Sequence, residues 1–171
     1  MVNWQGPPEG WVCLNTDGAV NLSEGTAAAG GILRRHDGRF IRAFAANLGG
    51  GSITHAELTG IVHGLRLAWD SGARKIEIQT DSVTAVHLIQ SGVDMHPHHA
   101  LIAEARRLIE LDWEVKVKHV FRESNFTADY LASLGQSLQI GVQVIDNPSP
   151  TLNYWMFFDV MGVQTPRLVN V

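Results

Sequence analysis

Four acidic side chains occur in short motifs spread along the chain: Asp17 in NTDGA, Glu57 in HAEL, Asp81 in QTDS and Asp129 in NFTADYLA. Residues 11–14, WVCL, are apolar, which is typical of a buried strand, and Asp17 follows at its end. A carboxylate there must be paired, protonated or bound to a cation, because an isolated buried charge costs too much free energy. Gly18 leaves the backbone room to bend or to let a ligand come close.

The chemistry open to such a group of acids is that of divalent cations. Four carboxylates that meet from separate segments repel one another unless cations neutralise them. Ligation by oxygen alone suits Mg²⁺ or Mn²⁺. Two such ions about 4 Å apart can clamp a phosphodiester, one activating water and the other stabilising the leaving oxygen. The motifs therefore indicate hydrolysis of a phosphodiester, provided that the fold brings the acids together.

The first half of the chain predicts a meander followed by a helical crossover. Strands expected at residues 11–20, 27–35 and 39–46 are joined by short turns, which favours antiparallel pairing. A helix over residues 55–70 follows, with Ser52 or Thr54 as its N-cap and Glu57 in its first turn. The next strand, residues 75–80, is reached through that helix and is therefore expected to be parallel to the first.

The second half predicts helices over residues 83–90, 99–111 and 125–137, with a strand over residues 113–121 before the last helix. In a sheet with parallel strands, sites form beyond the carboxyl ends of neighbouring strands. Asp17 and Asp81 both end such strands, so we expect the acids to converge there.

Composition limits the class of protein. The 171 residues favour one domain, and 45% hydrophobic with 18% charged residues is ordinary for a globular chain. A single cysteine excludes an internal disulfide and a thiolate metal cluster. The formal net charge of −4 counts against strong autonomous binding of nucleic acid.

The two ends predict no targeting or membrane segment. Residues 1–10 are rich in Gly and Pro and are expected to be an arm or linker rather than a signal peptide. Residues 11–138 form the expected domain. Residues 139–171 form an extension that packs on the domain or on a partner; its longest apolar run, residues 154–163, is interrupted by Asp159 and is too short to span a bilayer. We expect an intracellular protein, in the nucleus or cytoplasm, without membrane association.

In their order along the chain, NTDGA, HAEL, QTDS and NFTADYLA resemble the D-E-D-D motifs of the ribonuclease H fold. More narrowly, the chain resembles the plant-type ribonuclease H domains of non-LTR retroelement reverse transcriptases and related host proteins. The resemblance covers residues 11–138, and the WQGPPEGW opening and the NPSPTL segment are also similar to that group. It implies an α/β (α+β) ribonuclease H-like fold: a five-stranded mixed sheet of order 3-2-1-4-5 with helices on both faces.

The resemblance also implies an activity and a role for each acid. Asp17 would bridge two Mg²⁺ ions, for which Mn²⁺ can substitute. Glu57 and Asp81 would hold the ion on the leaving-group side, and Asp129 the ion that activates water. The implied reaction cleaves the RNA strand of an RNA/DNA hybrid and leaves a 5′-phosphate and a 3′-hydroxyl, with selectivity from contacts to the 2′-hydroxyl.

Further residues are candidates for contact with substrate: Gly18, Ala19, Ser82 and Arg122. Arg122 could instead form an ion pair with a nearby acid. His119 stands ten residues before Asp129, where many ribonucleases H place a mobile catalytic histidine on a glycine-rich loop. The segment KHVFRESN has no glycine, so a packed or hydrogen-bonded strand histidine is an equal alternative.

Individually, each acid has a simpler interpretation. Asp17 could be a turn residue, Asp81 a helix N-cap, Glu57 a first-turn acid favoured by the helix dipole, and Asp129 an exposed helical residue. These explanations do not account for all four falling at the motif positions of one family. The histidines of MHPHH, at residues 96, 98 and 99, lack a companion ligand in sequence, which favours a solvated loop over a transition-metal site.

Two departures from the family predict weak binding of isolated substrate. Some ribonucleases H carry an extra basic helix between the two central helices, whereas residues 92–98 fill that gap here without Lys or Arg. Residues 49–54 also lack the paired Asn that some members use near the minor groove. A reverse transcriptase or another tethered domain is therefore an expected partner, and no sequence feature indicates an oligomeric state.

Two other functions stay open. One is a catalytically silent module that keeps the fold and binds nucleic acid or protein. The other is a different nuclease of the same superfamily, such as a DNA-junction resolvase.

Overall fold

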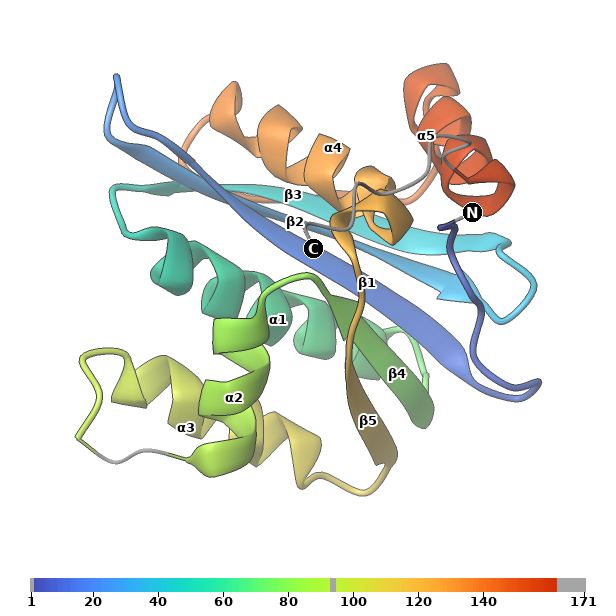
Figure 1. The fold of residues 1–171 in the computed structure, drawn as a ribbon, viewed down its shortest axis with the longest axis horizontal. Coiled ribbons are helices and arrows are strands. Elements are labelled where there is room, and N and C mark those ends of the chain that lie inside the picture. Colours follow the sequence, from blue (N-terminus) through green and yellow to red (C-terminus); the bar gives the residue numbers. More distant parts are fainter. Residues whose placement is uncertain (1, 93–94, 163–171) are drawn as a thin grey trace, which may run out of the picture.

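The structure, a computed structural model, describes residues 2–92 and 95–162. One mixed sheet forms its middle layer, and helices cover both faces of the sheet (Figure 1). The strands are β1 (Val12–Asn21), β2 (Thr26–Arg35), β3 (Phe40–Gly49), β4 (Lys75–Thr80), β5 (Glu114–His119) and β6 (Gly141–Ile145). The helices are α1 (Ile53–Asp70), α2 (Val83–Ser91), α3 (His99–Ile109), the short 3₁₀ turn η1 (Arg122–Ser124), α4 (Phe126–Gln136) and α5 (Pro150–Met161).

The strand order is β5-β4-β1-β2-β3-β6. β1, β2 and β3 pair antiparallel as a meander, whereas β4 pairs parallel to β1 and β5 parallel to β4. The expected order 3-2-1-4-5 and the mixed character of the sheet are therefore confirmed. Both parallel connections pass through helices, as such connections require.

The expected number of strands, five, is wrong, because a sixth strand extends the sheet. β6 pairs antiparallel with β3, from Ala43↔Ile145 to Ala46↔Val142. Its residues are mostly exposed, so the segment carries no strong pattern of buried and exposed positions. The strand forms because β3 offers it an unpaired edge, which is a tertiary interaction that local sequence does not reveal.

The two faces of the sheet are covered by different helices. In Figure 1, α1, α2 and α3 lie on one side, and α4 and α5 lie on the other. Apolar residues at helical spacing form one face of α1 and are buried: Leu58, Ile61, Val62, Leu65 and Ala68. No helix within residues 2–92 and 95–162 is long and apolar enough to cross a membrane.

The start of α1 differs from expectation by two residues. The helix begins at Ile53, and Ser52 is its N-cap, because the Ser52 hydroxyl accepts a hydrogen bond of 3.1 Å from the His55 backbone N–H. Glu57 therefore lies beyond the first turn rather than in it, and no acid occupies the first turn. The helix dipole, which acts mainly within the first turn, does not explain the presence of Glu57.

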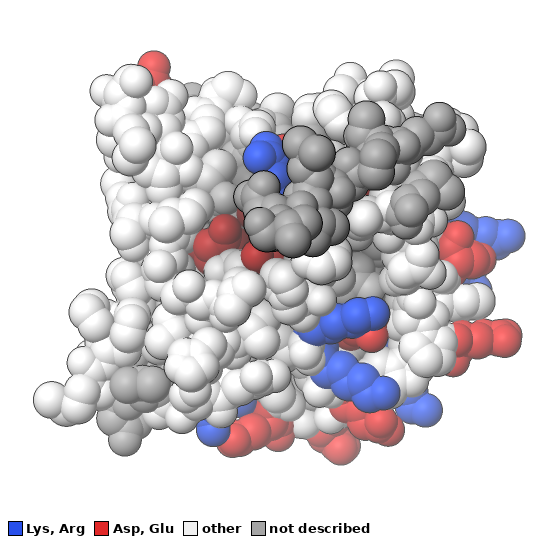
Figure 2. Space-filling view, viewed as in Figure 1, with Lys and Arg blue, Asp and Glu red and all other residues white. Residues whose placement is uncertain are grey.

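Charge is unevenly distributed over the face shown in Figure 2. Acidic atoms are visible in a depression near the middle of that face, and basic and acidic side chains alternate at its lower right. Most of the left part carries neither kind. No continuous basic stripe crosses the described surface in this view.

Helix α4 sits directly on β2 because Gly30 has no side chain. A Cβ atom at Gly30 would overlap the backbone of Leu131 and Ala132 in α4. The absence of this side chain sets the distance between the helix and the sheet.

Gly30→Ala is expected to lower the free energy of unfolding by about 2 kcal/mol, because the added methyl forces α4 away from the sheet. Urea unfolding followed by circular dichroism measures the change. Gly50→Ala is the matched control, since the nearest atom to a Cβ there, the Gly25 carbonyl oxygen, is 3.7 Å away. Equal stability of both variants would contradict the proposed contact.

Candidate metal centre

Two neighbouring parallel strands deliver the first two acids. β1 pairs with β4 as far as Thr16↔Thr80, and Asp17 and Asp81 are the next residues of the two segments. Parallel strands run in the same direction, so both carboxylates emerge at the same end of the pair. The expectation that Asp17 ends its strand is wrong, because β1 continues to Asn21; Asp17 lies within β1, just beyond the point where its pairing with β4 stops.

The third acid arrives from α1, which approaches β1 closely at Gly18. A Cβ atom on Gly18 would lie 2.6 Å from the Glu57 backbone nitrogen and 2.7 Å from the Ala56 carbonyl carbon. These are backbone atoms that a side chain could not displace without moving the helix. The glycine after Asp17 thus permits the close approach of the helix that carries Glu57.

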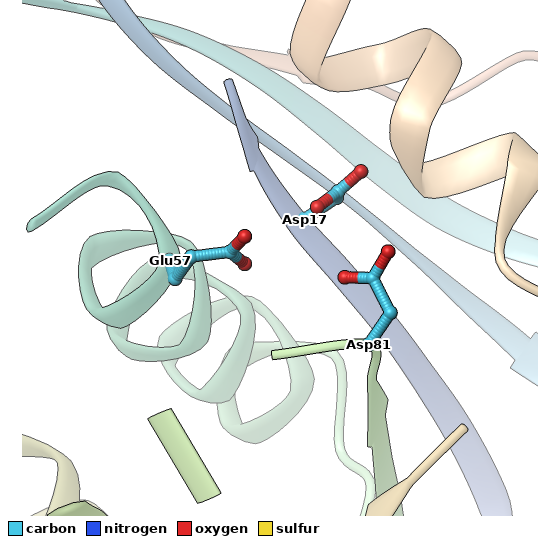
Figure 3. A group of neighbouring side chains, drawn as sticks. All are labelled: Asp17, Glu57 and Asp81. Atoms are coloured by element: carbon cyan, nitrogen blue, oxygen red, sulfur yellow. The ribbon is translucent and has the colours of Figure 1, made fainter. Parts of the chain in front are cut away.

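The carboxylates of Asp17, Glu57 and Asp81 converge (Figure 3). One oxygen from each lies within 4.8 Å of the other two. Asp17 is only 6% exposed and Glu57 8% exposed. The Gly18 backbone N–H donates a 2.9 Å hydrogen bond to Asp17 Oδ1, whereas the buried Glu57 Oε2 has no hydrogen-bond partner among the described residues.

Burial and mutual repulsion hold these acids toward their neutral forms in the metal-free protein. Burial, followed by the charges of Glu57, Asp81 and Asp129, raises the pKa of Asp17 to about 9. Burial and the charge of Asp81 raise the pKa of Glu57 to about 8. The pKa of Asp81 is also raised, mainly by burial. An ionised triad therefore needs a positive charge beside it.

The three acids fit a divalent cation. Their ligand atoms are all carboxylate oxygens, which is the set that Mg²⁺ and Mn²⁺ prefer. A cation would also supply the missing partner of Glu57 Oε2 and offset the repulsion within the triad. Within residues 2–92 and 95–162, this is the one group of three or more His, Cys, Asp or Glu side chains with ligand atoms so close together.

Asp129 lies near the triad but outside it. Its charge contributes to the raised pKa of both Asp17 and Asp81. Its Oδ2 is 3.8 Å from a guanidinium nitrogen of Arg122, and the two side chains are 35% and 69% exposed. The ion-pair alternative for Arg122 is thus the arrangement present, and both partners remain accessible to solvent.

The other predicted site residues occupy varied surroundings. Ser82 is the N-cap of α2, since its hydroxyl accepts a 3.1 Å hydrogen bond from the Ala85 backbone N–H. Ala19 pairs with Ala28 in the β1–β2 ladder. His119 is the exposed last residue of β5, and its ring makes an edge contact with Phe121 at 5.9 Å between centroids.

The loop histidines have a companion that the sequence did not indicate. The ring centroid of His98 lies 5.4 Å from that of His96 and 5.9 Å from that of His55, at the start of α1. His98 Nε2 is 3.4 Å from the Ser52 hydroxyl. The nitrogens of the three rings do not form a compact ligand set of the kind found for the acidic triad.

Sequence reasoning missed a buried polar network beside the site. Its members are Asn15, Arg34, Gln79, Asn125, Thr127 and Asp159, all buried. Two signals were present in the sequence: an asparagine within the apolar β1 segment, and an aspartate that interrupts the apolar run of residues 154–163. A charged residue in such a run indicates a buried partner.

The sheet order, the helices on both faces and the acids that meet where β1 passes the end of β4 define a ribonuclease H-like domain. Residues 15–135 match the family described as reverse transcriptase-like. This match covers well over half of the chain, and the chain belongs to that family of ribonuclease H-like domains.

Individual relatives agree with this assignment. The chain is 36% identical over 172 residues to a "putative ribonuclease H protein" of Arabidopsis thaliana, and the match covers 100% of this chain and 28% of that protein. The chain thus spans little more than a quarter of its relative.

Solved structures share the fold. Ribonuclease H1 from the archaeon Halobacterium salinarum superposes with a TM-score of 0.68 at 27% identity, covering 73% of this chain and 96% of that one. LC11 ribonuclease H1, solved in complex with an RNA/DNA hybrid, gives a TM-score of 0.66 at 20% identity, covering 72% and 94% of the two chains.

The triad predicts how stability depends on pH without metal. Because the pKa of Asp17 rises from 3.8 to about 9 on folding, its contribution is fully favourable below about pH 4 and is lost as pH rises toward 9. Thermal unfolding in a chelator should therefore show a falling melting temperature over this range.

Asp17→Asn should flatten that dependence and stabilise the metal-free protein at pH 8 by at least about 1.4 kcal/mol, the value of one pKa unit. Asp112→Asn, at an exposed aspartate, is the control and should behave as the unmodified chain. A destabilised Asp17→Asn protein at pH 8 would show that repulsion in the triad is not a significant cost.

Proposed function

We propose that this domain is a divalent-metal-dependent endoribonuclease that cleaves the RNA strand of RNA/DNA hybrids. The observation that carries the proposal is the convergence of three carboxylates, those of Asp17 and Glu57 buried and that of Asp81 partly buried, with one oxygen of each within 4.8 Å of the others. Membership of the reverse transcriptase-like family and the ribonuclease H names of its relatives support the reaction class. The LC11 enzyme, which shares the fold, was solved with the hybrid that we propose as substrate.

Four residues are assigned to the cations, which we propose to be two Mg²⁺ ions with Mn²⁺ as a substitute. Asp17, the central acid, is assigned to both. Glu57 and Asp81 are assigned to the ion on the leaving-group side, and Asp129 to the ion on the water side. The chemistry supplied when such a pair is bound is activation of the attacking water and stabilisation of the leaving oxygen, yielding a 5′-phosphate and a 3′-hydroxyl.

The chain itself contributes orientation and exclusion of water. The Gly18 N–H holds one oxygen of Asp17, which fixes the rotamer of that carboxylate. Burial of Asp17 and Glu57 keeps water from screening their charges, so a cation held there is bound more strongly than at an exposed site.

The substrate must be bound by groups near the rim of the site. Arg122 pairs with Asp129 at 3.8 Å. When a cation binds Asp129, this ion pair would break and the Arg122 guanidinium would become available to contact a phosphate. We propose the backbone at Gly18 and Ala19 and the Ser82 hydroxyl as additional contacts, and His119 as an exposed group that assists metal exchange or product release. Because the net charge of the chain is −4, we propose that a tethered reverse transcriptase or other domain supplies much of the affinity for the hybrid.

The central test is cleavage of a labelled RNA/DNA hybrid with Mg²⁺ or Mn²⁺. Asp17→Asn and Glu57→Gln should each lower the rate by at least about 100-fold, because each removes an anionic ligand, whereas Asp112→Asn should retain full rate. Equal cutting by Asp17→Asn and the unmodified protein would exclude the mechanism. Preferential cleavage of branched DNA would instead identify a resolvase, and failure to bind metal in calorimetry a silent binding module.

A second expectation concerns affinity. The isolated domain should bind hybrid with a Kd weaker than about 1 µM, because the net charge is −4, residues 92–98 carry no Lys or Arg, and phosphate contacts dominate such binding. Fluorescence anisotropy over about 50 to 200 mM salt measures this, and the affinity should fall as salt rises. Nanomolar, salt-insensitive binding would contradict the expectation that a tethered domain is needed.

A further inference from the structure

We infer that Asp159, on α5 and outside the residues matched by the family, is a positioning residue for Asp129. The inference rests on the proposed metal site, because Asp129 is assigned there as the fourth ligand. Asp159 does not itself reach the triad; it acts on the start of α4, three residues before Asp129.

Helix α4 lacks a cap of its own. Its N-cap residue, Asn125, makes no capping hydrogen bond with its side chain. The first backbone N–H groups of a helix have no partner within the helix, and a buried start needs partners from elsewhere.

Asp159 supplies that cap from a distant segment. Its carboxylate accepts hydrogen bonds from the Phe126 N–H at 2.9 Å, from the Thr127 N–H at 3.3 Å and from the Thr127 hydroxyl. The negative charge also lies at the positive end of the α4 dipole. The first turn of α4, which carries Asp129, is therefore held by a residue of α5.

A buried arginine holds Asp159 in turn. A terminal nitrogen of Arg34 lies 3.0 Å from Asp159 Oδ2, and both side chains are 0% exposed. The Arg34 guanidinium also donates to Asn15 Oδ1, at 3.0 and 2.8 Å, and stacks on the Trp4 ring at 4.4 Å from its centroid. Arg34 lies on β2, so the pair fixes α5 to the middle of the sheet.

The same network reaches the strand that carries Asp17. The Asn125 side-chain amide donates to the Thr16 carbonyl oxygen at 3.0 Å, and the Asn15 amide donates to Asn125 Oδ1 at 3.1 Å. Thr16 immediately precedes Asp17. The Asn125 side chain is used for this link to β1, which is why the helix cap must come from Asp159.

One continuous set of buried hydrogen bonds thus sets where Asp129 lies relative to Asp17. A chain ending at residue 138 would leave the buried charge of Arg34 without a carboxylate and the start of α4 without its cap. The C-terminal helix is on this inference a functional part of the nuclease rather than an appendage.

The test separates positioning from stability by means of three variants. Asp159→Asn removes the charge but leaves Arg34 buried and uncompensated, so it can unfold the chain. The double variant Arg34→Met/Asp159→Leu removes both charges and should regain most of the melting temperature. Leu152→Ala, in the core of the same helix, lowers stability without touching the network and is the matched control.

The first readout is Mn²⁺ affinity, measured by calorimetry under conditions where each variant is folded. We expect the double variant to bind Mn²⁺ about 10-fold more weakly than the unmodified chain, as for loss of a group that orients a ligand, and Leu152→Ala to bind it unchanged. Wild-type affinity in the double variant, or an equal loss in Leu152→Ala, would overturn the inference.

The second readout, amide hydrogen exchange of residues 126–129, needs no metal. Exchange should be faster in the double variant and unchanged in Leu152→Ala. If the unmodified chain bound no Mn²⁺, the proposed function would fail, yet the exchange result would still decide whether Asp159 holds the start of α4. Unchanged exchange in the double variant would refute that role.

Discussion

The structure depends on one electrostatic constraint: three carboxylates are kept within 4.8 Å of one another, and two of them, those of Asp17 and Glu57, are buried from water. Folding without a cation must protonate these acids or accept their repulsion, which is the physical meaning of the raised pKa values of Asp17, Glu57 and Asp81. A protein keeps such an arrangement only if the rest of the fold stabilises it. The scaffold around β1 can be understood as the means of doing so.

Both helical layers contribute to this one strand. On one face, α1 comes close enough to deliver Glu57 because Gly18 has no side chain. On the other face, α4 is tied to the Thr16 carbonyl through Asn125 and to α5 through Asp159. Glu57 and Asp129 therefore approach Asp17 on β1 from opposite sides of the sheet, and each approach is fixed by backbone contacts or buried hydrogen bonds rather than by flexible side chains.

The buried Arg34–Asp159 pair is a costly way to fix a helix, because both charges leave water. Three further hydrogen bonds to the Asp159 carboxylate offset part of this cost. The Arg34 guanidinium also donates two hydrogen bonds to Asn15 and makes a cation–π contact with the Trp4 ring. An apolar contact would also hold α5 on the sheet, but it would allow the helix to shift along its axis. A charge pair with directional hydrogen bonds specifies one register, which suits a helix whose start must be placed accurately.

The sequence by itself determined the meander, the crossover helix and the acids that meet, because strand and helix periods and short acidic motifs are local features. Asp17, Glu57 and Asp81 could be selected from such motifs before their geometry was known. Only the tertiary structure decided that β6 extends the sheet, that Arg122 pairs with Asp129, and that Arg34 and Asp159 meet across 125 residues. Those interactions join segments far apart in the chain, and each depends on the shape of a surface that exists only after folding, so no local pattern records them.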